Sequence, residues 1–172
     1  MRGSAEARGV RASAEARGLT EPDVVPSLRD MHGQPWPWPP VADGESAAWL
    51  VFLPGAFTPV CTGELGWLGD LSVELAVEGV GVRVISCDAA PVLREVSERM
   101  GLPEECVLLS DFWPHGAAAR AFGLLDEATG RPRRVSVLVD GEAAALAQVA
   151  AAPGEARTAQ AHRDALAVLA GR

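Results

Sequence analysis

The sequence predicts an α/β fold in which a mixed central sheet carries helices on both of its faces. From Trp49 onward, short apolar runs alternate with helix-length segments, in the order strand–helix–strand and later strand–strand–helix. The earlier runs are apolar almost throughout, which is typical of parallel strands covered on both faces. With 172 residues, of which 48% are hydrophobic and 22% are charged, the chain suits one globular domain.

Residues 1–20 stand apart from this pattern. The hexapeptide Ser-Ala-Glu-Ala-Arg-Gly occurs at residues 4–9 and again at residues 13–18. The segment lacks the apolar centre of a secretory signal, and its glutamates argue against an organelle transit peptide. We therefore predict a disordered N-terminal extension over residues 1–20, rather than a functional helix, and a folded domain over residues 21–172.

The first predicted strand, Trp49–Leu53, ends at Pro54-Gly55, and a helix follows it. Thr58 suits the N-cap of this helix, because Pro59 suits its first position and favours an extended residue before it. The apolar stripe of the helix consists of Cys61, Leu65, Leu68, Leu71 and Leu75. Gly63, Gly66 and Gly69 lie off this stripe, and either they permit close packing of the backbone or they reflect compositional drift.

The remaining elements follow from apolar runs and from the residues that end them. Gly101 and Pro103 end one helix, Gly123 ends another, and Asp140-Gly141 indicates a hairpin, whereas the prolines of residues 36–40 favour a loop or an edge. The predicted strands are Val80–Cys87, Val107–Leu109, Val135–Val139 and Ala144–Val149, and the predicted helices are Pro91–Met100, His115–Phe122 and Thr158–Leu169. This order of elements is that of the thioredoxin-like fold.

Composition and charge exclude several classes of partner. The formal net charge is −8 and the sequence has no basic stripe, so we expect no nucleic-acid or anionic-membrane partner. The sequence contains no long apolar span, and we expect no membrane crossing.

Its cysteines, Cys61, Cys87 and Cys106, are odd in number and have neither C-x-x-C nor zinc-site spacing. We therefore expect a reducing, cytoplasmic location, with neither a disulfide scaffold nor a metal or cofactor.

Cys61 is the main candidate for chemistry. It falls in the first turn of the predicted helix, among N–H groups without intrahelical partners and at the positive end of the helix dipole. Both effects favour the thiolate, which is the reactive form of cysteine. A thioredoxin would place a second cysteine three residues later, but that position holds Glu64. Cys61 must therefore react without a neighbouring thiol.

The pattern Pro-x-x-x-Thr-x-x-Cys, from Pro54 to Cys61, resembles that of the peroxiredoxins, and the likeness extends from Pro22 onward. The string Leu-Ser-Asp-Phe-Trp-Pro-His-Gly-Ala at residues 109–117 is similar to that of one-cysteine peroxiredoxins of the alkyl hydroperoxide reductase E type. Pro-Gly-Glu at residues 153–155 and Asp-Ala-Leu at residues 164–166 add to this likeness. The resemblance implies that Cys61 attacks the peroxide and becomes a sulfenic acid. It also implies that Thr58 bonds the sulfur or the peroxide, that Pro54 shields the thiolate, and that Arg134 is the active-site arginine.

The resemblance implies a thiol-dependent peroxidase that reduces hydrogen peroxide, alkyl hydroperoxides or peroxynitrite. Its reductant would be an external thiol or a thioredoxin-like or glutaredoxin-like protein. The alternative is a peroxide-sensing relay or a chaperone that uses the same cysteine without sustained turnover. A homodimer is also implied, and we expect Phe57 or Trp113 to contribute apolar contact to it.

Four further residues have open roles. Glu64 either orients the loop or the arginine, or is simply a favourable acid in a first helical turn. We expect Cys87 and Cys106 to be buried structural cysteines rather than resolving ones. We expect His115 to cap or pack near the sheet, because the reaction needs no histidine base.

Overall fold

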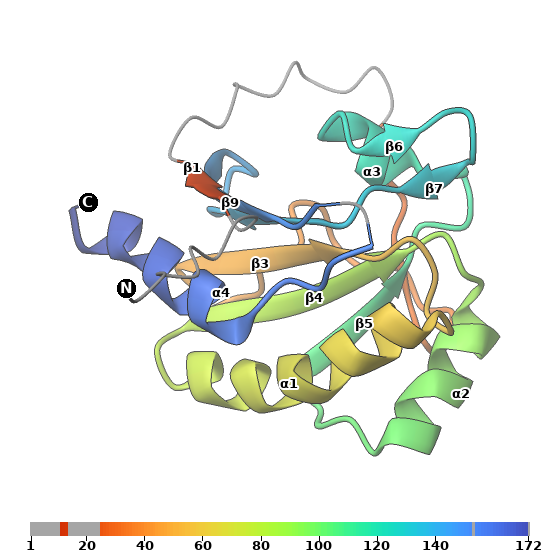
Figure 1. The fold of residues 1–172 in the computed structure, drawn as a ribbon, viewed down its shortest axis with the longest axis horizontal. Helices are drawn as coiled ribbons and strands as arrows, with labels where there is room; N and C mark the ends of the chain where they lie inside the picture. Colours follow the sequence, from red (N-terminus) through yellow and green to blue (C-terminus); the bar gives the residue numbers. More distant parts are fainter. Residues whose placement is uncertain (1–10, 14–24, 153, 172) are drawn as a thin grey trace, which may run out of the picture.

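The computed structural model describes residues 11–13, 25–152 and 154–171. In this part of the chain, a seven-stranded sheet has the order β1-β9-β8-β3-β4-β5-β2, and β6 and β7 form a small second sheet (Figure 1). The strands are β1 (Arg11–Ser13), β2 (Arg29–Asp30), β3 (Ala47–Phe52), β4 (Val80–Ser86), β5 (Cys106–Ser110), β6 (Leu125–Asp126), β7 (Arg131–Pro132), β8 (Val135–Val139) and β9 (Ala145–Ala150). The helices are α1 (Pro59–Ala76), α2 (Ala90–Met100), α3 (Ala117–Ala121) and α4 (Ala159–Ala165), followed by the 3₁₀ helix η1 (Leu166–Gly171).

The main sheet is mixed, as predicted. Strands β3, β4 and β5 run parallel, with α1 and α2 as the connections between them. Strand β8 pairs antiparallel with β3, and β9 pairs antiparallel with β8. This arrangement confirms the thioredoxin-like fold.

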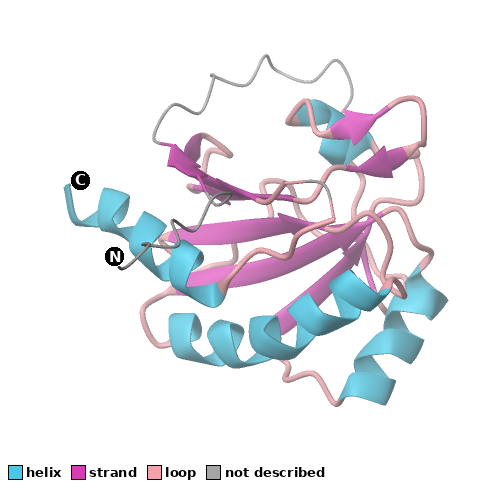
Figure 2. Ribbon diagram, in the orientation of Figure 1, coloured by secondary structure: helices cyan, strands magenta, loops and turns pink. Residues whose placement is uncertain are grey.

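Helices cover both faces of the sheet, which confirms the predicted layers (Figure 2). On one face, α1, α2 and α4 pack on side chains such as Trp49 and Val51 of β3. On the other face, α3 and the β6–β7 pair pack on the alternate residues of the same strand, Leu50 and Phe52. Strand β3 is therefore buried along its whole length, as its apolar sequence indicates.

Helix α1 begins as predicted, with Thr58 as its N-cap and Pro59 in its first turn. All five residues of its predicted apolar stripe are buried. Of its three glycines, Gly69 faces Pro103, and a Cβ atom there would lie 3.1 Å from the proline ring. Gly63 and Gly66 face open space. Close packing therefore explains Gly69 but not the other two glycines.

The later elements differ from the predictions mainly at their ends. Strand β8 has the predicted bounds, and the bounds of the other predicted strands and of α2 differ from the predictions by at most two residues. Helix α3 begins only at Ala117, because Gly116 before it has a left-handed backbone with a φ of 66°. The predicted final helix is two elements, since α4 ends at Ala165 and the 3₁₀ helix η1 continues from it.

The structure adds short strands that were not predicted. Strand β2 pairs with β5, and β6 pairs with β7. In the predicted N-terminal extension, Arg11–Ser13 forms β1 beside β9, so these three residues differ from the expected disorder. A free strand edge offers unpaired backbone groups, which explains why a short segment adds there. The rest of residues 1–20 lies outside the described residues.

Candidate active site

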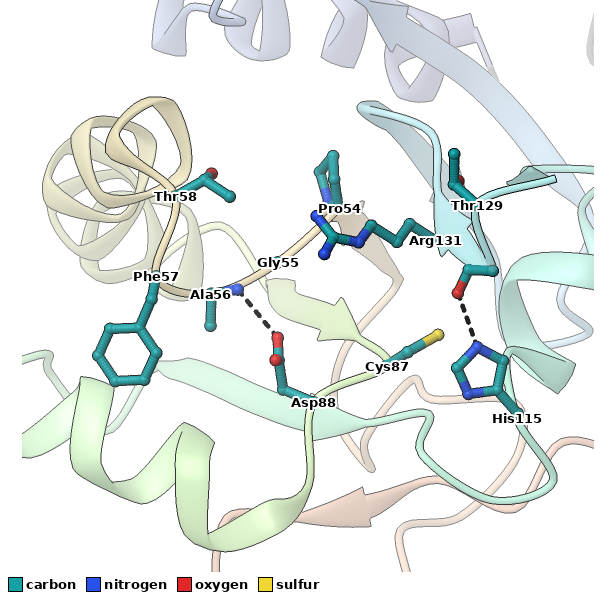
Figure 3. A pocket seen from close by; sticks show the side chains of 11 residues that line it. Pro54, Gly55, Ala56, Phe57, Thr58, Cys87, Asp88, His115, Thr129 and Arg131 are labelled. Carbon is teal, nitrogen blue, oxygen red and sulfur yellow. Dashed lines mark hydrogen bonds between the residues drawn. The ribbon is translucent and has the colours of Figure 1, made fainter. Parts of the chain in front are cut away.

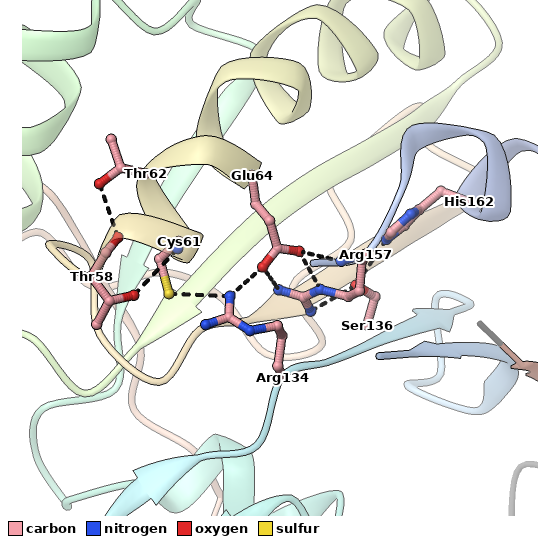
Figure 4. Close-up of polar contacts among 8 residues, drawn as sticks. All are labelled: Thr58, Cys61, Thr62, Glu64, Arg134, Ser136, Arg157 and His162. Atoms are coloured by element: carbon pink, nitrogen blue, oxygen red, sulfur yellow. Dashed lines mark hydrogen bonds and ion pairs between the residues drawn. The ribbon is translucent and has the colours of Figure 1, made fainter. Parts of the chain in front are cut away.

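Three of the four predicted site residues meet around one sulfur atom (Figure 4). The Cys61 side chain is fully buried in the first turn of α1. Its backbone N–H donates to Thr58 Oγ1 at 3.3 Å, and Arg134 Nη1 lies 3.2 Å from Cys61 Sγ. The helix N-terminus and the guanidinium therefore place hydrogen-bond donors and positive charge around the thiol, and the threonine hydroxyl caps the helical turn that carries it.

Sheet pairing explains why Arg134 lies so close to Cys61. Arg134 directly precedes β8, and β8 is the antiparallel neighbour of β3, with Ser136 opposite Val51. The end of β3 leads through Pro54 into the loop before α1. The start of β8 and the start of α1 therefore meet at the same edge of the sheet. Arg134 retains only 13% exposure of its side chain there.

Glu64 is an arginine-binding residue and not merely a favourable acid in a first turn. It is fully buried, and its Oε1 forms an ion pair with Arg134. Its Oε2 accepts from Nε of Arg157 at 2.7 Å and from the backbone N–H of the same residue at 3.2 Å. Burial alone would raise the pKa of Glu64, but Arg157 and Arg134 outweigh it and lower this pKa below its ordinary value. The carboxylate is therefore charged, and it holds both guanidinium groups.

Arg157 is a site residue that the sequence analysis missed. It is 1% exposed, it precedes α4, and it reaches Glu64 from a position 93 residues away along the chain. Burial lowers its pKa, and the hydrogen bonds and charge of Glu64 oppose this shift. The segment around it lacks helical or strand periodicity, so no local signal marks it in the sequence.

A polar chain continues from Arg157 into the core. Arg157 Nη1 donates to Ser136 Oγ at 3.0 Å, and Ser136 Oγ lies 2.8 Å from His162 Nε2. His162 Nδ1 lies 2.7 Å from the carbonyl oxygen of Thr158, which can only accept. Nδ1 therefore carries the proton, and Nε2 accepts from the serine hydroxyl. Burial lowers the pKa of His162 to about 4, so its imidazole is neutral at neutral pH.

Two cavities approach the site from either side of Pro54. One, of about 510 Å³, is lined by Thr58, Cys87, Asp88 and His115 among others (Figure 3). The other, of about 560 Å³, is lined by Arg134 and by apolar residues such as Val135 and Ala150. Pro54, Thr129 and Arg131 line both cavities. Pro54, the fourth predicted site residue, therefore borders both cavities, and its shielding of the Cys61 thiolate stays a prediction.

The other two cysteines are free and differ in environment from Cys61. Cys106 is buried, and burial raises the pKa of its thiol to about 12. Cys87 is half-buried, and burial together with Asp111 and Asp88 raises its pKa to about 12 as well. Both are therefore protonated at neutral pH. Cys106 is buried as predicted, whereas Cys87 differs from the prediction because it is only half-buried and lines the cavity beside the active-site loop.

His115 links two elements on the far side of the cavity. Its Nε2 lies 2.6 Å from the carbonyl oxygen of Gly130, in the turn between β6 and β7 (Figure 3). It contacts the turn rather than the Cys61 sulfur, as expected for a packing residue.

In the part of the chain that the structure describes, no group of His, Cys, Asp or Glu side chains could hold a metal ion.

Comparison with known proteins gives consistent matches. Residues 26–144 match the model of the AhpC/TSA family. The chain is 37% identical to alkyl hydroperoxide reductase E of Mycobacterium tuberculosis over 120 residues, which is 70% of this chain and 77% of that protein. The same protein of Mycobacterium bovis matches equally well.

Solved structures agree with these sequence matches. AhpC of Enterococcus faecalis superposes with a TM-score of 0.72 and 25% identity, over 84% of this chain and 86% of the other. The peroxidoxin BcpB of Mycobacterium tuberculosis superposes with a TM-score of 0.69 and 26% identity, over 84% and 91%. Among the helices that the structure describes, none combines the length and apolarity needed to cross a membrane.

Proposed function

The chain belongs to the AhpC/TSA family of peroxiredoxins, which are thiol-dependent peroxidases, and on this premise we propose that Cys61 is its peroxidatic cysteine. The substrates proposed are hydrogen peroxide, alkyl hydroperoxides and peroxynitrite. One observation carries the proposal: the guanidinium of Arg134 lies 3.2 Å from the Cys61 sulfur, which is itself in the first turn of α1. Among the described residues, neither Cys87 nor Cys106 lies in a first helical turn with an arginine bonded to its sulfur.

The chemistry follows from this geometry. The Cys61 thiolate attacks one peroxide oxygen, so that an S–O bond forms while the O–O bond breaks. The departing oxygen gains negative charge. From hydrogen peroxide or an alkyl hydroperoxide it takes a proton from solvent and leaves as water or an alcohol, and from peroxynitrite it leaves as part of nitrite. Arg134, Thr58 and first-turn N–H groups are donors fixed near this oxygen, and such donors lower the barrier. Glu64, paired with Arg157, keeps the Arg134 guanidinium in place.

The product is Cys61 sulfenic acid, which must be reduced before another turnover. One external thiol condenses with it to give a mixed disulfide and water, and a second thiol releases Cys61 as the external disulfide forms. Such a thiol could come from a small molecule or from a thioredoxin-like or glutaredoxin-like protein. The high pKa values of Cys87 and Cys106 support an external reductant over a resolving cysteine. The free cysteines also support a cytoplasmic, reducing location.

Mass spectrometry after one equivalent of peroxide tests the proposal. We expect one added oxygen on the peptide that contains Cys61, no intramolecular disulfide, and no oxidation in a Cys61→Ser variant. Stopped-flow tryptophan fluorescence would then give the rate. Sustained peroxide consumption with excess dithiothreitol supports the enzyme, whereas a single stoichiometric oxidation supports the relay. An unmodified Cys61 would contradict the assignment.

We also propose that the chain forms a homodimer through the rim of the site. Phe57, Phe112 and Trp113 expose 54%, 54% and 75% of their surface, so these aromatic side chains do not pack inward. Exposed aromatic residues beside a site are typical of protein interfaces. The other exposed large apolar residues, such as Val77, lie on α1 or after it, or near residue 25.

The dimer proposal predicts that Trp113→Ala weakens assembly and lowers the peroxidase rate. Light scattering coupled to size exclusion, at tens of micromolar in reducing buffer, gives the mass directly. Val77→Ala is the matched control, because Val77 is 89% exposed but lies at the far end of α1. A wild-type mass equal to the 18.0 kDa of one chain would overturn the dimer.

A further inference from the structure

Asp88 lies beside the active-site loop but outside the group of residues around Cys61. It follows β4 and precedes α2, and it lines the cavity opposite the loop of residues 54–58 (Figure 3). Its Oδ2 accepts from the backbone N–H of Ala56 at 2.9 Å. Ala56 lies midway between Pro54 and Thr58 and is 2% exposed. Asp88 therefore contacts the loop at its centre.

The loop is otherwise bonded mainly at its two ends. At one end, the Thr58 carbonyl accepts from the Thr62 N–H at 2.9 Å and from the Thr62 hydroxyl at 3.0 Å, in the first turns of α1. At the other end, Leu53, just before the loop, donates its N–H to the carbonyl of Ile85 in β4 at 2.9 Å. Within the loop, Thr58 N–H reaches only the Gly55 carbonyl, at 3.4 Å. Arg99 of α2 lies over the Phe57 ring at 6.0 Å, which is a loose contact. Among the described residues, the Asp88–Ala56 bond is the one hydrogen bond from the loop backbone to the β4–α2 turn.

Asp88 is itself fixed by two strand ends. Ser86 Oγ donates to Asp88 Oδ2 at 2.8 Å and accepts from the Asp88 N–H at 3.3 Å. Ser110 Oγ, at the end of β5, donates to the Asp88 carbonyl at 2.6 Å. Both serines are buried. The carboxylate is therefore a rigid acceptor built on the ends of β4 and β5.

We propose that Asp88 is a positioning residue of the peroxidase site, whose carboxylate holds Ala56 and thereby fixes Pro54 and Thr58 around Cys61. This inference rests on the proposed function of Cys61. The loop residues act on the reacting oxygens only if they are correctly placed, and a shift of about 1 Å can cost about a hundredfold in rate. The effect of Asp88 is therefore on peroxide chemistry, beyond any effect on folding.

Three variants separate positioning from general stability. Asp88→Ala removes the acceptor, whereas Asp88→Asn keeps an oxygen that can accept from Ala56. Asp30→Ala is the matched control, because Asp30 Oδ1 likewise accepts from two loop N–H groups, of His32 and Gln34, each at 2.9 Å, but at the β2 edge. Each variant is assayed for its rate with peroxide, for alkylation of Cys61 by iodoacetamide with the modified peptide identified by mass spectrometry, and for urea unfolding.

We expect Asp88→Ala to lower the second-order rate constant with peroxide by roughly 10- to 100-fold, while alkylation changes by less than about threefold. Asp88→Asn should retain most of the peroxide rate, and Asp30→Ala should retain all of it at a comparable loss of stability. If Asp88→Ala does not fold, Ser86→Ala provides the test, since it frees the carboxylate and should lower the peroxide rate in the same direction.

The outcomes also separate this inference from the function on which it rests. An inactive wild-type protein would overturn the assignment of Cys61 and not the role of Asp88 in the loop. An active wild type with an unchanged peroxide rate in Asp88→Ala would overturn the positioning role. Equal losses in the peroxide and alkylation rates, or an equal loss in Asp30→Ala, would show that Asp88 acts through folding alone, and would overturn it too.

Discussion

Arg134 contacts two acceptors at once, the Cys61 sulfur and the Glu64 carboxylate. Glu64 also pairs with Arg157, so two guanidinium groups share one carboxylate in a buried cluster. The cluster therefore carries one positive charge more than Glu64 balances. The nearest remaining acceptor for the donors that carry this charge is the sulfur of Cys61 and, during the reaction, the peroxide oxygen that departs as the O–O bond breaks. The pairing with Glu64 keeps Arg134 extended toward that position.

Replacing Arg134 by Met should slow peroxide reduction about a hundredfold or more, because a donor to the departing oxygen is lost. Alkylation of Cys61 by iodoacetamide should slow by less than about tenfold, since that reaction has no peroxide oxygen to stabilise. Stopped-flow fluorescence and timed alkylation measure the two rates. Arg133→Met is the control, because the Arg133 guanidinium bonds the Gly123 carbonyl instead. Equal slowing of both reactions in Arg134→Met would argue against a role in the transition state.

The sequence predicted the residues that lie on recognisable local patterns and missed those defined only by packing. Thr58, Cys61 and Pro54 share one loop-and-cap motif, and Arg134 directly precedes an apolar strand. Arg157 and His162 belong to the C-terminal segment, and their partners Glu64 and Ser136 come from α1 and β8. These contacts depend on the way α4 packs beside the sheet. No spacing along the chain encodes them.

At the scale of elements, α1 and α4 begin in the same way. Thr58 Oγ1 accepts from the N–H of Cys61 at 3.3 Å, and Thr158 Oγ1 accepts from the N–H of Ala161 at 3.2 Å. Each threonine is an N-cap with extended backbone. Only the first of these caps lies beside a reactive group. A comparison of the two threonines therefore separates the structural role of a capping hydroxyl from a catalytic role.

Thr58→Val and Thr158→Val should each lower the free energy of unfolding by about 1 kcal/mol, the usual value of an N-cap. Only Thr58→Val should also lower the peroxide rate, by at least about tenfold. Thr58→Ser, which keeps the hydroxyl, should retain both the stability and the peroxide rate of the wild type. Urea unfolding and stopped-flow fluorescence supply the two measurements. A similar loss of peroxide rate in Thr158→Val would mean that helix capping alone accounts for the effect.

The elements that the sequence predicted are long enough to show a period or a continuous apolar run. The strands that it missed are β1, β2, β6 and β7. They have two or three residues each, which is too short for either pattern. They form because the chain passes an existing edge or folds back on itself, as Leu125 does opposite Pro132. Such pairings follow from the tertiary fold, and local propensity has little influence on them.

At the scale of the whole molecule, two buried titratable groups oppose each other in their effect on stability. Burial lowers the pKa of His162 to about 4, so its contribution to stability is complete above the ordinary histidine pKa and decreases as pH falls toward 4. Burial raises the pKa of Asp111 to about 6, although the N–H groups of Ala118 and Ala119 partly offset this shift. The contribution of Asp111 is therefore present below its ordinary pKa of 3.8 and is lost as pH rises through 6.

Each shift corresponds to roughly 3 kcal/mol, so the two contributions nearly cancel between about pH 4.5 and pH 6 in the wild type. Single substitutions should reveal them. The free energy of unfolding of the wild type minus that of His162→Gln should decrease as pH falls through this range, because the variant no longer loses stability on protonation. The free energy of unfolding of the wild type minus that of Asp111→Asn should increase as pH falls through the same range. Urea unfolding at closely spaced pH values measures both differences, and only their slopes matter, so that a constant destabilisation of either variant does not affect the result. Differences that stay constant with pH would contradict the assigned shifts, and slopes of the same sign would contradict the opposition of the two groups.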